Sequence, residues 1–139
     1  MKKEISYLET LKAIDECKKH FESQLEVRLG LTKVQSPIFV KTSTGLQDKL
    51  TGVEKAVSFK KEDEKFEIVH SLAKWKRVSL GKYKIPAHKG IYTDMKAIRK
   101  DEIVDDIHSL YVEQWDWEKV IGKEDRTIDY LKDTVKSIY

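Results

Sequence analysis

Residues 91–117 (IYTDMKAIRKDEIVDDIHSLYVEQWDW) constrain the fold more than any other part of the chain. Segments 92–98 and 109–117 are rich in aromatic and branched side chains, which are typical of β-strands. The segment RKDEIVDD between them is too polar for a protein core. The sequence therefore predicts two strands joined by a charged loop, a hairpin around which the rest of the chain has to pack.

The side chains of the second strand divide into two sets, because successive residues of a strand point to opposite faces. One set is Leu110, Val112, Gln114 and Asp116, and the other is Tyr111, Glu113, Trp115 and Trp117. Both sets include large apolar side chains, so we expect this strand to be buried on both faces. A buried carboxylate needs a partner. We expect Arg99 and Glu102, at the end of the first strand, to face a common cavity.

Several longer phrases resemble one protein family. They are HSLAKWKR (70–77), IYTDMKAIRKDE (91–102) and HSLYVEQWDWE (108–118), and the earlier phrases QSPIFV and GLQDKLTGVEKAV fit as well. In this order they resemble aspartate–ammonia ligase, the ammonia-dependent asparagine synthetase with a class II aminoacyl-tRNA synthetase fold. The resemblance covers nearly the whole chain. A strand ending in arginine and glutamate, a loop, and a returning strand with an inward acid are similar to motif 2 of that fold.

The resemblance implies an α/β (α+β) fold, with an antiparallel sheet flanked by the N-terminal and C-terminal helices. Residues 1–139 would form the N-terminal part of a single catalytic domain, with motif 1 at about 5–41 and motif 2 at about 91–118. Motif 3 is absent from the chain. An apolar helical stripe over 124–139, with no glycine or proline to end it, agrees with a domain that is incomplete at its C-terminus.

The N-terminal segment predicts a long amphipathic helix over 5–29. Ser6 and Glu9 have the spacing of a capping box, and Gly30 is placed to end the helix. The apolar stripe consists of Ile14, Cys17, Phe21 and Leu25. We expect Cys17 to fill the core, because free cysteines are usually buried as small apolar residues.

The segment after this helix predicts a strand over 31–41 that contains Pro37, so it should lie at a sheet edge or bulge. The resemblance implies that this helix and strand form motif 1 and a homodimer interface, whereas the residues alone favour an ordinary edge strand. Two strands at 56–60 and 65–71 surround the turn KEDE, and a short helix follows at 73–80.

Composition limits the classes of function. The net charge of +3 suits a phosphate-bearing ligand but is too small for the basic stripe of a nucleic-acid binder. No apolar run approaches the roughly 20 residues of a membrane span, and MKKEISYLETLKAIDE has no apolar core of a secretory signal. The single cysteine excludes an intrachain disulfide. We expect a cytoplasmic protein with no nucleic-acid or membrane partner.

The candidate substrate site rests on the resemblance, because the residues alone show no nucleophile–base–acid arrangement. Without the resemblance, Asp48 would be interpreted as a solvated turn residue and His70 as a core histidine. The family places an acid at the position of Asp48 to hold the amino group of the substrate, and a polar contact at Ser71. Lys76 matches a lysine near the substrate carboxylate. Gln114 and Asp116 are further candidates for the substrate ammonium and polar contacts, and Asp116 could alternatively help to hold magnesium.

The candidate nucleotide site consists of Arg99 and Glu102. A guanidinium group can bind phosphate through two hydrogen bonds, so Arg99 is assigned to the α-phosphate of ATP. Glu102 resembles the motif 2 glutamate that accepts a hydrogen bond from the adenine amino group. Arg99 and Lys76 are the predicted catalytic residues, and no metal ligand is assigned in this chain.

The resemblance implies that aspartate, ammonia and ATP are converted to asparagine, AMP and pyrophosphate through β-aspartyl-AMP, with ATP and Mg²⁺ as cofactors. There are two alternative functions. A synthetase that charges tRNA would need an anticodon-binding domain before the catalytic core, and a helix that begins by Ser6 leaves no room for it. A truncated, inactive paralogue that binds adenylate or dimerises without catalysis remains open.

Overall fold

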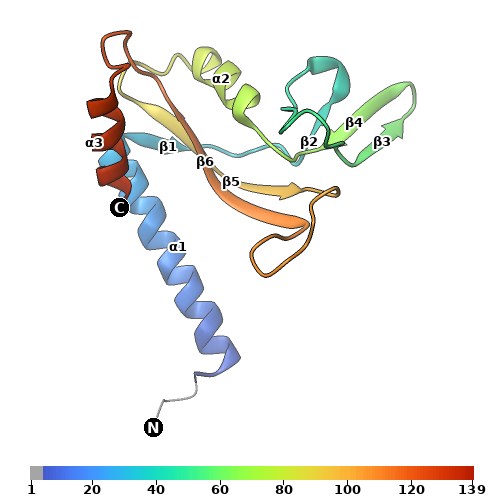
Figure 1. Cartoon of the computed structure of the whole chain (residues 1–139), viewed down its shortest axis with the longest axis horizontal. Coiled ribbons are helices and arrows are strands. Elements are labelled where there is room, and N and C mark those ends of the chain that lie inside the picture. The colour runs from blue at the N-terminus through green and yellow to red at the C-terminus, as the bar shows by residue number, and fades with distance from the viewer. Residues whose placement is uncertain (1–4) are drawn as a thin grey trace.

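The computed structural model describes residues 5–139, which form helices and two small sheets (Figure 1). In chain order the elements are α1 (Tyr7–Leu29), β1 (Leu31–Lys33), β2 (Phe39–Lys41), the short 3-10 helix η1 (Thr42–Thr44), β3 (Ser58–Lys61), β4 (Glu64–Ile68), α2 (Ala73–Lys82), β5 (Gly90–Ile98), β6 (Tyr111–Lys119) and α3 (Ile128–Ile138). The predicted mixed α/β architecture is confirmed. Residues 1–4, which fall within the predicted domain and within the segment predicted to lack a secretory signal, lie outside the described residues.

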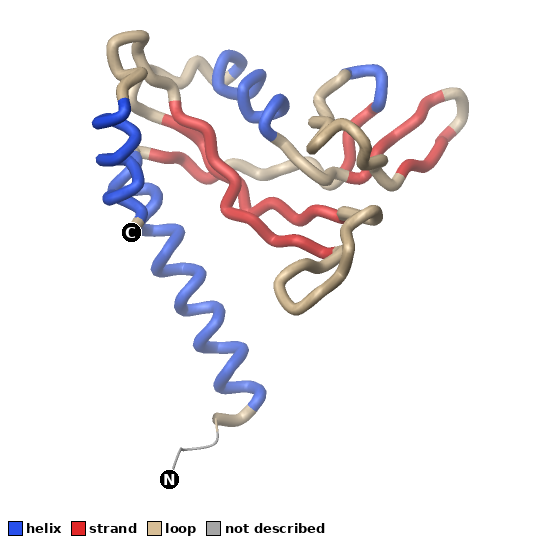
Figure 2. The backbone as a smooth tube through the Cα atoms, in the orientation of Figure 1, coloured by secondary structure: helices blue, strands red, loops and turns tan. Residues whose placement is uncertain are grey.

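The predicted hairpin is present as the antiparallel pair β5–β6, whose register runs from Gly90 opposite Lys119 to Ile98 opposite Tyr111. The strands are long and twisted and run through the middle of the molecule (Figure 2). Gly90 is required where the pair begins. A Cβ atom there would lie inside van der Waals contact with the backbone oxygen of Glu118 and 2.9 Å from Cα of Lys119.

The first sheet has the strand order β1-β5-β6, with β1 parallel to β5, so β5 is the central strand. Ile91 and Tyr92 of β5 are fully buried. The expectation that 109–117 is buried on both faces is wrong, because β6 lies at the sheet edge. Trp115 and Trp117 are only half-buried, and Gln114 is exposed.

The predicted strand 31–41 is wrong as a single strand. It is divided into β1 and β2, which belong to different sheets, and Pro37 lies between them. After β1 the backbone N–H of Val34 donates to the carbonyl of Tyr92, and the chain then leaves β5. Proline has no N–H to continue a ladder, which explains why the strand breaks in this segment. β2 instead joins the antiparallel sheet β2-β4-β3.

Helix α1 ends where the sequence predicts, and it begins at Tyr7, two residues after the predicted start of 5–29. The capping box of Ser6 and Glu9 is formed, and Gly30 has φ +67°. The C-terminal half of α1 packs on the sheet through Leu25 and Leu29. The ring of Phe21 is tilted by 37° to that of Trp115, with 4.6 Å between the ring centroids. The N-terminal half projects away from the sheet (Figure 1), and this is why Cys17 is exposed rather than part of the core.

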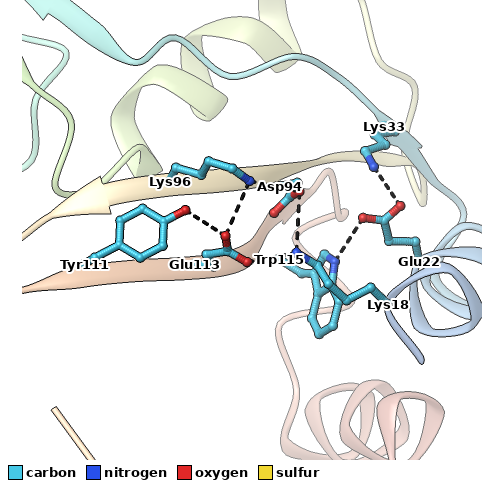
Figure 3. Close-up of polar contacts among 8 residues, drawn as sticks. All are labelled: Lys18, Glu22, Lys33, Asp94, Lys96, Tyr111, Glu113 and Trp115. Atoms are coloured by element: carbon cyan, nitrogen blue, oxygen red, sulfur yellow. Dashed lines mark hydrogen bonds and ion pairs between the residues drawn. The ribbon is translucent and has the colours of Figure 1, made fainter. Parts of the chain in front are cut away.

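A network of charged side chains also holds α1 on this face of the sheet (Figure 3). Lys18 Nζ lies 2.8 Å from an oxygen of Glu113, and Trp115 Nε1 donates to Glu22 at 3.1 Å. The hydroxyl of Tyr111 donates to Glu113 at 2.7 Å. The hydrogen bonds from Lys18 and Tyr111 lower the pKa of Glu113 to about 2. The carboxylate of Glu113 is therefore ionised at neutral pH and joins α1 to β6.

The opposite face of the sheet is covered by α2, which Figure 1 shows on the other side from α1. Leu72 and Trp75 pack there against Met95 and Ala97 of β5. Helix α3 lies beside the C-terminal half of α1 and begins after the N-cap Thr127, later than the predicted start at 124. Its predicted apolar residues remain exposed; they are Ile128, Leu131, Val135 and Ile138.

Candidate functional site

The predicted site residues of the sheet lie on the face that α2 covers. In the β5–β6 register Thr93 is opposite Asp116 and Met95 is opposite Gln114, and Arg99 continues the same alternation of β5. Helix α2 packs against both strands of this pair. Lys76 of α2 and Asp116 of β6 therefore face each other, and Arg99 lies further along the same face of the hairpin.

Lys76 and Asp116 form an ion pair between α2 and β6. The side chain of Lys76 is 1% exposed and that of Asp116 is 26% exposed. Lys76 Nζ makes no hydrogen bond of regular geometry within the described chain, so the carboxylate of Asp116 is its main compensation for burial. The structure thus brings together two residues that the sequence assigned to separate substrate contacts.

Asp48 and Ser71 also lie together. Oδ2 of Asp48 accepts hydrogen bonds from the Ser71 hydroxyl and from the backbone N–H of Lys74, both at 3.1 Å. The Lys74 N–H belongs to the first turn of α2, where backbone donors are free and the helix dipole favours negative charge. Asp48 therefore stabilises the start of the helix that carries Lys76.

The loop around Asp48 is held by two residues to which the sequence assigned no site role. Gln47 donates from Nε2 to the carbonyl of Ile68 at 2.7 Å and accepts from the N–H of His70 at 3.3 Å. His70 is 3% exposed, and its Nε2 contacts the carbonyl of Asp48, so the expected core histidine is confirmed. No pattern in the sequence pointed to Gln47, because its partners are backbone groups more than twenty residues away.

Arg99 and Glu102 face a common cavity, as predicted. The backbone N–H of Arg99 donates to Leu110 at 2.8 Å, and that of Glu102 donates to Arg99 at 3.1 Å, so the base of the loop is ordered. The cavity is small, about 50 Å³, and is also lined by His70 and Lys55. Nε of Arg99 is buried and has no hydrogen-bond partner among the described residues. Buried donors are normally satisfied, and a guanidinium is well suited to a phosphate or carboxylate.

Helix α2 and His70 connect the three pairs of candidate residues described above. These pairs are Lys76 with Asp116, Asp48 with Ser71, and Arg99 with Glu102. Asp48 caps the helix that carries Lys76, and His70 contacts Asp48 while lining the cavity of Arg99. A second cavity of about 600 Å³ lies next to the first, and both Asp48 and His70 line it, together with Lys74 and Lys100. The site therefore carries both carboxylate and ammonium groups on one connected surface.

Gln114 lines neither of these two cavities. Together with Asp116, it lines a different hollow of about 350 Å³ beside β6, which also includes Phe21 and Trp115. No cluster of three histidine, cysteine or acidic side chains suited to a metal ion occurs among residues 5–139. None of the helices in this part of the chain is both long and apolar enough to cross a membrane.

The fold is similar to that of an aminoacyl-tRNA synthetase. It is similar to a crystal structure described as that of a threonyl-tRNA synthetase from Aeropyrum pernix, with a TM-score of 0.69 and 15% identity. The similarity covers 88% of this chain and 29% of that chain, and at this identity it shows the fold alone.

The chain belongs to the aspartate–ammonia ligase family, whose model matches residues 8–139. It is 57% identical over 136 residues to the aspartate–ammonia ligase of Fusobacterium nucleatum, covering 97% of this chain and 42% of that protein. It is 52% identical over 138 residues to the ligase of Clostridium perfringens strain 13, covering 97% of this chain and 41% of the relative. The chain thus spans about two fifths of the length of the curated relatives it matches.

Proposed function

We propose that this chain supplies the aspartate-binding and nucleotide-binding surface of a ligase that makes asparagine from aspartate, ammonia and ATP. The single observation that carries the proposal is the buried Nε of Arg99, a cationic donor without a partner in the described chain. It lies next to Glu102 in a cavity that His70 connects to Asp48. The names of the relatives support the same reaction.

The chemistry requires fixed positive charge, because a carboxylate is a poor electrophile and has to be activated. In the proposed reaction the side-chain carboxylate of aspartate attacks the α-phosphate of ATP and releases pyrophosphate, which gives β-aspartyl-AMP. Ammonia then displaces AMP. Negative charge builds up on the α-phosphate in the first step, and Arg99 is the donor we assign to it. Glu102 accepts from the adenine amino group.

The aspartate substrate is assigned to the groups near α2. Asp48 and Ser71 hold its ammonium group, and Lys76 faces its carboxylate, with Gln114 and Asp116 as further polar contacts. Lys76 already pairs with Asp116. We therefore propose that Asp116 orients the lysine and keeps its charge buried while the substrate carboxylate binds beside it.

Magnesium remains a proposal that rests on the chemistry of ATP. Mg²⁺ commonly uses one or two carboxylates together with phosphate oxygens. The described residues do not form a metal cluster by themselves. A homodimer formed through residues 5–41 and a cytoplasmic location are also proposed, because they fit the family assignment.

The test is aspartate-dependent AMP formation from ATP and ammonia by the full-length natural protein. Replacing Arg99 by Ala should reduce kcat about 10²–10³-fold, the usual effect of removing one donor to a developing negative charge. Arg126→Ala, an exposed arginine, is the matched control. Activity of Arg99→Ala within tenfold of the wild type would remove Arg99 from the role. ATP binding without AMP formation in the wild type would favour the inactive paralogue instead.

A further inference from the structure

The loop over residues 45–57 connects the two halves of the candidate site. It has no regular secondary structure and contains Asp48. At its start, Asp48 is bonded to Ser71 and to the first turn of α2. Past Asp48, the loop closes on itself, because both the N–H and the hydroxyl of Thr51 donate to the carboxylate of Glu54, at 2.9 and 2.7 Å. Residues 51–54 in its centre therefore form a hydrogen-bonded turn.

The far end of this loop is attached to the nucleotide side of the site. The backbone N–H of Lys55 donates to Oδ2 of Asp101 at 2.8 Å. The other carboxylate oxygen, Oδ1, is 2.7 Å from Nζ of Lys100. The hydrogen bonds from Lys100 and Lys55 lower the pKa of Asp101 below its ordinary value. A charged acceptor makes a stronger hydrogen bond to a backbone N–H than a neutral acceptor does.

Asp101 lies between the two candidate nucleotide-binding residues: it is two positions after Arg99 and directly before Glu102. The cavity of Arg99 and Glu102 is lined from the other side by Leu50 and Glu54 of the 45–57 loop. The two walls of this cavity are joined by the bond between Asp101 and the N–H of Lys55. A ligand that orders Arg99 and Glu102 therefore also orders the acceptor that holds the loop of Asp48.

We propose that Asp101 is a positioning residue that couples nucleotide binding at Arg99 and Glu102 to aspartate binding at Asp48. The inference rests on the proposed function and extends it to the order in which the site is assembled. Nucleotide binding holds Asp101 in place, Asp101 holds Lys55, and the loop then presents Asp48 in its bound position. Aspartate thus binds a loop that is already ordered, and this makes the two ligands bind cooperatively.

The experiment measures the dissociation constant of radiolabelled aspartate by equilibrium dialysis of the full-length protein, with and without saturating α,β-methylene-ATP, which cannot form the adenylate. We expect the nucleotide to tighten aspartate binding roughly tenfold in the wild type. Asp101→Ala should reduce this enhancement to less than about twofold. Asp101→Asn keeps an oxygen that can accept from Lys55 and should retain most of the enhancement. Asp106→Ala, an exposed acid of the same loop, is the matched control.

A second measurement is independent of the variants. In the wild type, the amide hydrogen of Lys55 should exchange more slowly when the nucleotide analogue is bound and aspartate is absent. Three results would overturn the inference but leave the proposed function intact. They are full enhancement in Asp101→Ala, no enhancement in the wild type, and unchanged exchange at the Lys55 amide. A wild-type protein that binds neither aspartate nor the nucleotide would instead overturn the proposed function, and the inference with it.

Discussion

The ion pair of Lys76 and Asp116 predicts an unequal response to removal of its two partners. The Lys76 side chain is 1% exposed, whereas that of Asp116 is 26% exposed. In Asp116→Asn the buried ammonium loses its counter-charge, and in Lys76→Met the remaining carboxylate can still be hydrated. Methionine also preserves most of the buried alkyl chain. Loss of the aspartate should therefore be the more damaging change.

The magnitude follows from burial. Removing one partner of a buried ion pair costs about 3–5 kcal/mol, and we take about 3 kcal/mol for Asp116→Asn because the pair is partly open to water. For Lys76→Met the expected cost is about 1 kcal/mol, as for a pair whose remaining charge is solvated. The double variant leaves no charge behind and should be more stable than Asp116→Asn alone.

Urea denaturation followed by tryptophan fluorescence provides the assay. Trp75 is next to Lys76, while Trp115 and Trp117 flank Asp116, so the reporters lie close to the perturbation. With a slope of about 1–3 kcal/mol per M, a loss of about 3 kcal/mol lowers the midpoint by roughly 1–3 M. Equal destabilisation by Lys76→Met and Asp116→Asn, or a double variant that is the least stable of the three, would contradict this prediction.

Two further predictions concern the remaining structure. Gly90→Ala should destabilise the protein by more than about 1 kcal/mol, because its Cβ would meet backbone atoms of β6. In the control Gly81→Ala, in α2, the added Cβ meets nothing within 4 Å, so the change should be neutral or stabilising by up to about 1 kcal/mol. Thermal melts of the two variants compare these effects. In the folded protein the pKa of Glu113 is lowered from its ordinary value of 4.5 to about 2. The stabilisation from its contact with Lys18 is therefore fully present above pH 4.5 and is lost as the pH falls from 4.5 towards 2. Because the Glu113 side chain is 40% exposed, screening by water limits this contribution to about 1 kcal/mol. Glu113→Gln should therefore remove that part of the pH dependence of unfolding, and an unchanged acid profile would contradict the assignment.

Much of the candidate site could be anticipated, but its internal connections could not. The resemblance pointed to Asp48, Ser71 and Lys76 individually. It did not indicate that Asp48 caps α2 or that Lys76 pairs with Asp116, since each contact joins residues more than twenty positions apart. Asp101 lies inside a recognised phrase, and only its bond to Lys55 distinguishes it from the other acids of the loop.

Features that depend on near neighbours could be predicted from the sequence. Aromatic and branched side chains on either side of a polar segment predicted the β5–β6 hairpin, and alternation predicted its two faces. The cap residues Ser6 and Gly30 predicted the ends of α1. These signals act over a few residues, so they survive whatever the rest of the chain does.

Only the tertiary structure decided which elements lie next to one another. It placed β1 beside β5 and left β6 at the edge of the sheet, so a strand with two apolar faces is only half-buried. It also carried the N-terminal half of α1 beyond the sheet and exposed Cys17. The physical reason is that a periodic pattern defines the face a residue occupies, whereas burial depends on what another part of the chain packs against that face.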